Sequence, residues 1–284
     1  MKNFIQNYNK IIQQALREDQ SRQDITSKLL IPKNRVSEGE IFFKEDGTLC
    51  GIEIAKCVFQ TLDKNVQFRK LFKDGESIKK HTVVATLKGK TRMLLSAERT
   101  ALNFLGYLSG ISTRTNQYAR EIRSYKAKVF DTRKTTPGLR LLEKYAVYCG
   151  GGMNHRVDLK EMVLIKDNHR EACYPKISIG EMINTIRRKT NVPIEIEVDT
   201  LDQFKEALVA YPDFILLDNM TCAQMKKAVL LSRTLSKKKQ PLLEASGGIT
   251  LKTIRSVAKT GVDRISIGAL THSHQSIDVS LESN

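Results

Sequence analysis

Six short apolar runs recur along the second part of the chain, each followed by a stretch of helical character. They return at intervals of roughly 20 to 35 residues, which is the spacing expected of successive β/α units. In chain order the runs are AKVFD, EMVLIK, PIEIEVD, DFILLD, PLLEAS and DRISIG. The pattern predicts parallel strands joined by helices. Six strands are too few to close an eight-stranded barrel, so we expect an open (incomplete) β/α barrel.

The first part of the chain, to about Gly110, has a different pattern. Residues 11–18, IIQQALRE, have helical spacing, whereas EGEIFFKE and HTVVATLKG alternate between polar and apolar positions. Turn-forming Asp-Gly and Gly-Lys pairs bound these segments. We therefore expect an α+β domain with antiparallel strands ahead of the β/α units, which begin at about Tyr125.

Each predicted β/α strand ends in a polar residue or a glycine. The residues at these ends are Asp131, Lys166, Glu197 with Asp199, Asp218, Ser246 and Gly268. The carboxyl ends of parallel strands in a barrel meet on one face, and that face carries the active site. Polar residues that merely mark strand ends would explain any one position, but the repetition favours a functional face.

The run PIEIEVD carries two carboxylates at alternate positions. Because successive side chains point to opposite faces, its aliphatic residues should lie under the outer helices, and Glu195 and Glu197 should point into the barrel. A buried carboxylate needs a cation, a hydrogen-bond donor or a metal. Glu197, nearer the carboxyl end, is the site candidate, whereas Glu195 is expected to pair with an interior Lys or Arg.

Cations gather at the ends of the first two predicted strands. Arg133 and Lys134 follow the first strand in DTRKTTPG, and Lys166 ends the second. Between them, GGGMNHR places His155 and Arg156 after three glycines that permit a tight turn or a close approach to a ligand. Arginine binds carboxylate or phosphate bidentately and lysine acts as a point charge, so we expect a small ligand with more than one kind of anionic group.

Two glycine turns near the end of the chain suit a phosphate group. EASGGIT follows one strand and precedes the helix-like TLKTIRSVAK, and SIGAL repeats the arrangement on the next strand. Such turns direct backbone N–H groups and a helix amino end at an anion, and barrels often bind phosphate with their last two strands. The candidate phosphate-binding residues are Ser246, Gly247, Gly248, Ser266, Ile267 and Gly268.

Glu197 and Asp218 end neighbouring strands opposite these cations. Carboxylates in this setting could hold Mg²⁺, largely through waters and substrate oxygens. They could instead pair with Lys134 and Lys166, and the residues alone leave both possibilities open.

The net charge of +16, from 47 Lys and Arg against 31 Asp and Glu, should attract anions. Nucleic acid is disfavoured because the sequence has no helix-turn-helix, zinc-finger or RNP-like motif and no Trp, and because its bases are spread along the chain. The one dense basic tract, SKKKQ at residues 236–240, is expected to be a solvated helix end or loop.

Two further features of the sequence bear on the cellular compartment of the protein. The five cysteines, Cys50, Cys57, Cys149, Cys173 and Cys222, have neither paired nor zinc-site spacing, so reduced and mostly buried thiols are expected. No apolar run approaches the roughly 18 residues of a membrane span, and the amino terminus lacks the apolar core of a secretory signal. We expect a cytoplasmic protein that is not bound to a membrane.

Taken together, these motifs resemble the quinolinate phosphoribosyltransferase family. The segments that carry the resemblance are EDQSRQDITSKLLIP, SAERTALNFLGYLSGIST, DTRKTTPGLRLLEKYAVYCGGGMNHR, MVLIKDNH, EIEVD, LLDNM, EASGGIT and ISIGALTHS. The resemblance implies an α/β protein in which an α+β sandwich domain (residues 1–110) precedes an open barrel (residues 111–270), with residues 271–284 packing back on the first domain. It also implies phosphoribosyl transfer from phosphoribosyl pyrophosphate (PRPP) to quinolinate with decarboxylation, giving nicotinate mononucleotide, pyrophosphate and CO₂ in de novo NAD biosynthesis.

The resemblance further implies Mg²⁺ as cofactor, a homodimer, and roles for the site residues. Arg99 of one subunit would complete the site of the other. The residues implied to hold the quinolinate carboxylates are Arg133, His155, Arg156 and that Arg99, with Thr132 also in the substrate site. Lys134 and Lys166 would serve pyrophosphate and nearby oxygens, and Glu197 and Asp218 would face the ribose and the metal. Lys134, Lys166, Glu197 and Asp218 form the implied catalytic group.

The segment around Arg99 also has a local interpretation. Ser96 is expected to be the N-cap of a helix, which would place Arg99 in the first turn, where its charge opposes the helix dipole. An anion bound in the neighbouring site would explain the residue. The expected buried face of this helix comprises Ala101, Leu102, Leu105 and Leu108.

Two other functions stay open at this point. A related pyridine- or pyrimidine-carboxylate acceptor would use similar cations and change only the substrate. A non-enzymatic basic protein would instead bind nucleic acid through its net charge, with salt-sensitive affinity and indifference to loss of Arg133.

Overall fold

The computed structural model describes residues 2–235 and 240–283, which form two compact units. Unit 1 consists of Met1–Asn116, Thr136–Gly151 and Thr271–Asn284, and unit 2 of Gln117–Thr135 and Gly152–Leu270. The basic tract SKKKQ lies outside the described residues except for Gln240. In the described part of the chain, no helix is both long and apolar enough to cross a membrane.

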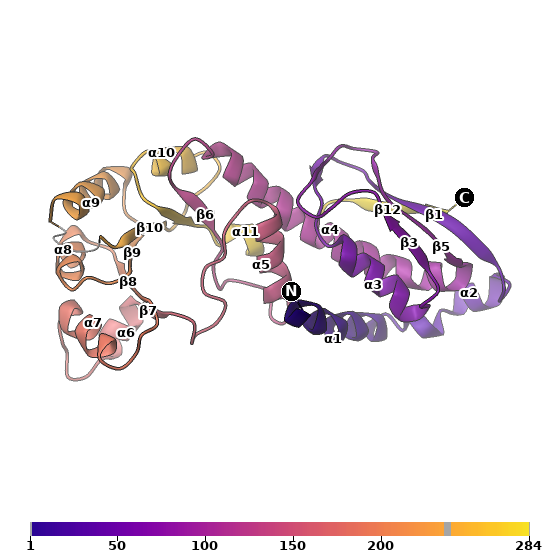
Figure 1. Ribbon diagram of the computed structural model, residues 1–284, viewed down its shortest axis with the longest axis horizontal. Helices are drawn as coiled ribbons and strands as arrows, with labels where there is room; N and C mark the ends of the chain where they lie inside the picture. The colour runs from indigo at the N-terminus through magenta and orange to yellow at the C-terminus, as the bar shows by residue number, and fades with distance from the viewer. Residues whose placement is uncertain (1, 236–239, 284) are drawn as a thin grey trace. The chain divides into compact units, whose positions relative to one another are not determined.

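A four-stranded antiparallel sheet with the order β12-β1-β5-β3 is the centre of unit 1 (Figure 1). Its strands are β1 (Val36–Phe43), β3 (Gln67–Lys70), β5 (Val83–Lys90) and β12 (Val279–Ser283), and β2 (Gly47–Thr48) pairs separately with β4 (Ser77–Ile78). The predicted α+β character with antiparallel strands is confirmed. β12 follows the whole of unit 2 in the chain, yet it pairs with β1.

Besides this sheet, beside which Figure 1 shows α3 and α4, unit 1 contains several helices. They are α1 (Lys2–Glu18), the 3₁₀ turn η1 (Ser21–Gln23), α2 (Ile25–Leu30), α3 (Ile52–Leu62), α4 (Thr91–Glu121), α5 (Arg140–Cys149) and, at the unit boundary, α11 (Ala269–His272). The expected buried face of α4 is confirmed, since its four predicted residues are at most 2% exposed. An apolar stripe at helical spacing packs α4 against its own unit.

The predicted N-cap at Ser96 is wrong, because α4 begins at Thr91. Leu94 is buried, so the apolar period of the helix extends further toward the amino terminus than Ser96. Within the helix, the Ser96 hydroxyl lies 2.7 Å from the Arg92 carbonyl oxygen and 2.9 Å from Asp24 Oδ2, a local bond typical of serine in a helix interior. Arg99 is therefore not in the first turn, and the helix dipole does not bear on its role.

Two glycines on α4 let the chain before β12 run directly against the helix. A Cβ atom at Gly106 would lie 2.5 Å from the Ile277 carbonyl oxygen, and one at Gly110 would overlap the carbonyl oxygen of Gln275. The Ile277 N–H donates to the Gly106 carbonyl at 3.0 Å. Residues 275–277 can therefore lie directly against α4 only because positions 106 and 110 carry no side chain.

Unit 2 contains one parallel sheet of six strands with the order β6-β11-β10-β9-β8-β7. The strands are β6 (Lys128–Phe130), β7 (Val163–Ile165), β8 (Ile194–Val198), β9 (Phe214–Asp218), β10 (Leu242–Ser246) and β11 (Arg264–Ser266), so all six predicted runs are confirmed. β6 and β7 stand at the two edges, and the parallel six-stranded sheet is consistent with the predicted open barrel.

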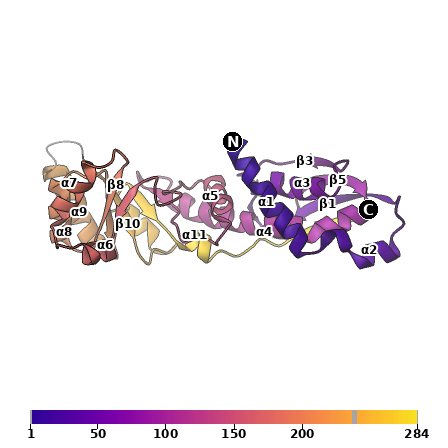
Figure 2. The ribbon, with the colours of Figure 1, turned by 90° about the horizontal axis from the view of Figure 1, so that it is seen from below.

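The connections between these strands are mostly helical. They are α6 (Asp167–Ala172), α7 (Ile179–Arg187), α8 (Leu201–Val209), α9 (Cys222–Leu235) and α10 (Ile254–Ala258). In both ribbon views α7, α8 and α9 cover one face of the strands (Figures 1 and 2). Ile194, Ile196 and Val198 are fully buried, as expected for residues beneath such helices.

Candidate active site

The carboxyl ends of the central strands line up at one edge of the sheet in unit 2. Ser246 at the end of β10 is directly opposite Asp218 at the end of β9, and Val198 of β8 is opposite Leu217. Glu197 and Asp218 are half-buried there, and Lys166, just after β7, is exposed. The buried sheet therefore presents a row of charged side chains to solvent at this edge.

Glu197 is the most constrained acid of this row. Its Oε2 lies 3.6 Å from the Lys166 ammonium, and its side chain is 15% exposed. Burial raises the pKa of Glu197, the positive charge of Lys166 lowers it, and the negative charge of Asp218 raises it again. Two carboxylates that repel one another across neighbouring strand ends form a setting that suits a hard divalent cation.

The Arg133 and Arg156 guanidinium groups are close enough to repel one another. Burial, followed by the positive charge of Arg133, lowers the pKa of Arg156. Arg156 is also anchored, since its Nη1 donates to the Met162 carbonyl at 3.0 Å. Fixed cations that repel one another favour an anion between them.

Thr132 and Lys134 form the turn that carries Arg133. The Lys134 N–H donates to Thr132 Oγ1 at 3.0 Å, which fixes the backbone directly after β6. The Lys134 side chain is exposed and Arg133 is half-buried. Arg133 and Lys134 therefore belong to a hydrogen-bonded turn.

A short segment beside β6 positions His155. Met153 forms a parallel bridge with Phe130, and its N–H donates to the Val129 carbonyl at 2.8 Å. The fully buried Asp131 carboxylate then accepts the Asn154 amide at 2.7 Å and the His155 N–H at 2.8 Å. Asp131 thereby sets the direction in which His155 leaves the backbone.

His155 belongs to a buried cluster inside the sheet. Its Nε2 lies 3.0 Å from Glu195 Oε2 and 3.4 Å from Glu244 Oε1, and its Nδ1 accepts the Arg156 N–H at 2.8 Å. Burial lowers the pKa of His155, but hydrogen bonds to the two carboxylates more than offset this and raise it to about 9. His155 also fixes the Arg156 backbone, which couples the cluster to the arginine pair.

The cluster holds one extra proton, which His155 and Glu195 share. Burial and the charge of Glu244 raise the pKa of Glu195, whereas His155 and Arg264 lower that of Glu244 despite its burial. Because His155 Nδ1 accepts an N–H, that nitrogen bears no proton in this arrangement, and the shared proton lies between His155 Nε2 and the Glu195 carboxylate.

The expectation that Glu195 pairs with an interior Lys or Arg is wrong. The interior arginine, Arg264, places its Nε 2.6 Å from Glu244 Oε2 instead. Its guanidinium lies 4.0 Å from the centre of the Phe130 ring and 4.5 Å from that of Phe214, and this stacking directs it toward β10. The three acid and imidazole groups could chelate a metal by their spacing, but Arg264 already supplies the neutralising charge.

The turn after β10 has the geometry proposed for phosphate binding, with one difference. Gly247 and Gly248 have φ of +99° and +57°, a region that glycine adopts without strain. The predicted helix over TLKTIRSVAK is wrong at its start, since α10 begins only at Ile254. Thr250 and Thr253 bind one another and the local backbone, which competes with helix formation. The residues that directly follow this turn therefore do not belong to the first turn of α10.

The second predicted phosphate turn is partly used within the sheet. The Ser266 hydroxyl lies 3.4 Å from the Ala245 carbonyl oxygen, and the Ile267 N–H donates to the Phe130 carbonyl at 2.9 Å. Ser266 and Ile267 therefore support the sheet, and Ser246 to Gly248 is the stronger phosphate candidate.

Asn219 is a residue of this edge that sequence reasoning missed. Its backbone is left-handed with φ of 51°, its N–H donates to the Ser246 carbonyl at 2.9 Å, and its Nδ2 donates to Asp218 at 2.7 Å. A Cβ atom at Gly247 would overlap its Oδ1. The signal was present in LLDNM, where an asparagine follows the strand-ending acid. Asp131 and Asn154 were likewise not assigned roles.

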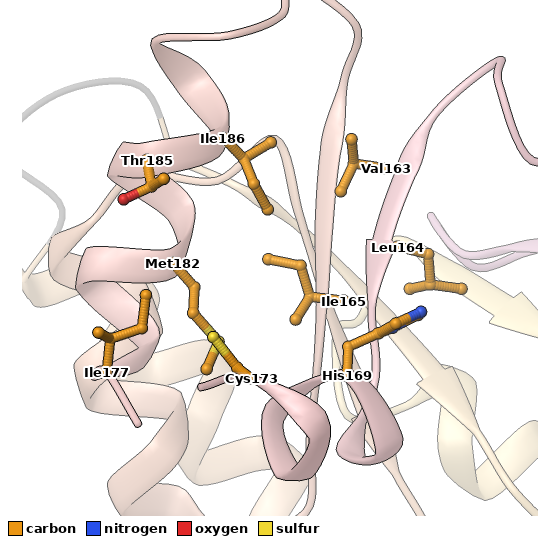
Figure 3. Close-up of a pocket in the computed structure, with 9 residues that line it drawn as sticks. All are labelled: Val163, Leu164, Ile165, His169, Cys173, Ile177, Met182, Thr185 and Ile186. Carbon is orange, nitrogen blue, oxygen red and sulfur yellow. The ribbon is translucent and has the colours of Figure 1, made fainter. Parts of the chain in front are cut away.

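Arg99 is described within unit 1 by itself. It is exposed on α4 and borders a groove of about 320 Å³ together with Asn103, Tyr107 and residues 276–279. In unit 2, a pocket of about 280 Å³ lies between β7, α6 and α7. Figure 3 shows Met182 and Ile186 projecting from α7 toward Ile165 of β7. This apolar pocket offers no Lys or Arg to hold a dianion, so it is not the candidate site.

Comparisons with known proteins give a consistent result over nearly the whole chain. The family model described as quinolinate phosphoribosyl transferase, N-terminal domain, matches residues 24–109, and the corresponding C-terminal domain model matches residues 111–282.

Relatives and solved structures agree with these matches. The chain is 41% identical over 275 residues to a probable nicotinate-nucleotide pyrophosphorylase [carboxylating] of Synechocystis sp., covering 95% of this chain and 90% of the relative. It is 38% identical to the nicotinate-nucleotide pyrophosphorylase [carboxylating] of Mycobacterium leprae, covering 95% of both. A solved nicotinate-nucleotide pyrophosphorylase from Francisella tularensis superposes with a TM-score of 0.92 at 38% identity, covering 98% of this chain and 96% of that one.

Proposed function

Because the chain belongs to the quinolinate phosphoribosyl transferase family, we propose that the strand-end face of unit 2 joins quinolinate to PRPP and releases pyrophosphate and CO₂. The product is nicotinate mononucleotide, and the chain is accordingly a pentosyltransferase of de novo NAD biosynthesis. The observation that carries the choice of site is that Lys166, Glu197, Asp218 and Ser246 lie together at the strand ends of this unit. Arg133 and Arg156 add two nearby positive charges, which a bound dicarboxylate would neutralise.

The proposed roles follow the charges on this face. Arg133 and Arg156 hold the carboxylates of quinolinate, because a planar guanidinium matches a carboxylate bidentately. His155 is buried with both ring nitrogens engaged, so its proposed part is to position Arg156 and the adjoining backbone. Lys134 and Lys166 face pyrophosphate, and the glycine turn after β10 receives the 5′-phosphate of the ribose.

Displacement at the anomeric carbon separates charge, and the site would stabilise both ends of that separation. The ribose becomes positive in the transition state, where Glu197 and Asp218 provide negative charge. The leaving pyrophosphate becomes more negative, where Lys134 and Lys166 provide positive charge. Groups fixed at strand ends need little reorganisation as these charges develop.

Decarboxylation needs little further chemistry from the protein. Once the pyridine nitrogen carries the ribose, the ring is an electron sink for the electrons of the adjacent carboxylate bond. The carbon that loses CO₂ then takes up a proton. Orientation and exclusion of water by the arginine pair suffice for this step.

The acids of this face fit Mg²⁺ as the cofactor. Glu197 and Asp218 repel one another, and a hard cation with oxygen ligands would remove that repulsion. When bound, Mg²⁺ would neutralise pyrophosphate charge. Lys166 already stands 3.6 Å from Glu197, so Asp218 is the freer of the two acids to approach the cation.

We also propose that the protein acts as a homodimer in which Arg99 of one subunit completes the site of the other. Unit 1 supports this with an apolar surface on α2, where Ile25, Leu29 and Leu30 are 72%, 79% and 74% exposed. Exposed apolar patches of this kind mark interaction surfaces. The free state of all five cysteines supports a reducing, cytoplasmic location.

The activity can be tested directly. Purified protein is incubated with Mg²⁺, PRPP and quinolinate labelled in the carboxylate next to the ring nitrogen, and labelled CO₂ and nicotinate mononucleotide are measured together. Both should appear in equal amounts. Product from nicotinate without CO₂ from quinolinate would replace the proposed acceptor with a related one.

The same assay tests the site through Arg133→Ala. Loss of a charged ligand to the carboxylate should lower kcat/KM by about 100-fold or more. Arg188→Ala removes an exposed arginine at the end of α7 and serves as the control, with activity near that of the wild type. Retained activity in Arg133→Ala would reject the site, and salt-sensitive binding of a polynucleotide by both variants would favour the nucleic-acid alternative.

A further inference from the structure

A second group of chemically capable side chains lies in unit 1, outside the strand-end face. Cys50, Asp74 and Cys149 each present one ligand atom, and these three atoms lie within 4.8 Å of one another. Cys50 is fully buried, and Asp74 and Cys149 are half-buried. None of the three takes part in the proposed reaction.

Three separate segments bring these residues together. Cys50 precedes α3, Asp74 lies in the loop between β3 and β4, and Cys149 is the last residue of α5. The first two segments are tied by backbone bonds, from Gly75 N–H to the Leu49 carbonyl at 2.8 Å and from Leu49 N–H to the Glu76 carbonyl at 2.9 Å. The group is therefore held in place by the fold before any ligand binds.

The Asp74 carboxylate is oriented as metal-binding carboxylates are. Its Oδ1 accepts the N–H groups of Gly51 and Ile52 at 3.0 and 3.1 Å, and its Oδ2 accepts the Tyr145 hydroxyl at 2.8 Å. Ligating carboxylates in proteins are commonly fixed by such outer hydrogen bonds. Oδ1 has used both of its lone pairs, whereas Oδ2 accepts one hydrogen bond and retains a lone pair for a cation.

The surroundings of Cys50, Asp74 and Cys149 carry negative charge. Cys149 ends α5, where the helix dipole is negative, and Asp74 adds a carboxylate. No ion pair of Asp74 occurs among the described residues, and burial raises its pKa, as the negative charge of Glu53 also does. The barrel cluster of His155, Glu195 and Glu244 differs, because Arg264 neutralises it from 2.6 Å.

We propose that Cys50, Asp74 and Cys149 bind a thiophilic divalent cation of the Zn²⁺ class, with a water as fourth ligand. Binding releases the protons of the two thiols, and the resulting thiolates and carboxylate coordinate the cation tetrahedrally. Tetrahedral zinc sites hold two sulfurs roughly 3.8 Å apart, which agrees with the observed grouping within 4.8 Å. A disulfide would require the sulfurs at about 2.0 Å and gives Asp74 no part.

Such a site would join the start of α3 to the end of α5. The residues after Cys149 lead through three glycines to His155 and Arg156, so the cation would anchor one end of the segment that carries Arg156. Its function is structural, and the protein's catalytic acids lie elsewhere.

Metal binding by the untagged, freshly reduced protein tests the proposal. The protein is equilibrated with Zn²⁺, dialysed against metal-free buffer and assayed for zinc, and a parallel sample receives Co²⁺ for absorption spectroscopy. We expect about one Zn²⁺ per chain and a thiolate-to-cobalt charge-transfer band with the intense visible bands of tetrahedral Co²⁺. Cys50→Ser and Cys149→Ser should each lose the metal and the band.

Matched variants make the result specific. Cys57→Ser and Cys222→Ser alter other free cysteines and should bind as the wild type does, and Tyr145→Phe should weaken binding by about tenfold through the outer shell of Asp74. If Cys50→Ser fails to fold, the more exposed Cys149→Ser carries the test. Zinc retained in Cys149→Ser, no zinc in the wild type, or cobalt without a thiolate band would each overturn the proposal.

Discussion

Asp131 illustrates how a residue with no proposed substrate contact can orient the residues that do contact the substrate. It is fully buried at the end of β6 and accepts hydrogen bonds from Asn154 and His155. The order of the segment that bears Arg156 depends on this carboxylate and on His155 Nδ1. The cations expected to touch substrate are thus held by acids and an imidazole beneath them.

The buried cluster makes stability depend on pH. The pKa of His155 is raised from 6.5 to about 9, so the folded cluster keeps a proton that the unfolded chain releases in this range. Its stabilisation is fully present below pH 6.5 and is lost as the pH rises toward 9, by an amount on the order of 3 kcal/mol. The urea concentration at the midpoint of unfolding should therefore decrease as the pH is raised from 6.5 to 9.

Glu195→Gln distinguishes where that proton resides. The amide imitates a protonated carboxyl, so this variant should be about as stable as the wild type below pH 6.5 and should lose much of the pH dependence above it. Strong destabilisation throughout, with the slope unchanged, would instead place the proton on His155.

Gly247 and Gly248 provide a matched pair at the proposed phosphate turn. Both have positive φ, but a Cβ atom at Gly247 would overlap Asn219 Oδ1, whereas one at Gly248 would meet nothing within 4 Å. Gly247→Ala should destabilise the turn by about 1–3 kcal/mol and raise the KM for PRPP, and Gly248→Ala should cost less. Steady-state kinetics at varied PRPP check both, and equal effects would contradict the role given to Asn219.

At the scale of elements, the sequence correctly predicted the strands that a local hydrophobic pattern determines. The six runs became six parallel strands because each is a short, continuous apolar segment bounded by polar residues. The alternation in PIEIEVD correctly placed Ile194, Ile196 and Val198 in the core.

The wrong predictions concern features that particular side-chain contacts determine, and two of the three involve residues distant in the sequence. Ser96 has the chemistry of an N-cap, but its hydroxyl binds Asp24 and Arg92 while the helix continues upstream. The partner of Glu195 depended on the stacking of Arg264 between Phe130 and Phe214, which no local pattern reveals. The late start of α10 followed from side-chain bonds of Thr250 and Thr253 that compete with helical ones.

The contact between α4 and the chain before β12 can be tested at Gly110. Alanine there would overlap the Gln275 carbonyl oxygen and must push residues 275–277 away from the helix. Gly110→Ala should lower the stability of unit 1 by about 1–3 kcal/mol despite the higher helix propensity of alanine. Gly180→Ala, in α7 and with only a distant neighbour at 4.0 Å, is the control and should be neutral or stabilising. Thermal unfolding followed by circular dichroism measures both changes.

At the scale of the whole molecule, the proposed dimer predicts complementation between inactive chains. Arg99→Ala and Arg133→Ala should each be nearly inactive alone. Mixed dimers would contain one site with both arginines intact, so random reassociation should restore about a quarter of wild-type activity.

The appropriate control is a chain carrying both substitutions. Reassociated with the wild type, it yields mixed dimers whose every site lacks one arginine, and these should be inactive. If mixed dimers of the single variants form but remain inactive, Arg99 does not act across the subunit boundary. Co-purification of an untagged variant with an affinity-tagged one verifies that mixed dimers are present.

The pairing of β12 with β1 affects how the protein is made. The ribosome exposes β1 early, but its partner at Val279–Ser283 emerges only after all of unit 2 has been synthesised. Until then, one hydrogen-bonding edge of β1 stays open to other nascent chains, and such edges invite aggregation. Slow translation would lengthen that interval, so the yield of this protein should respond to chaperones that bind extended, unpaired strands.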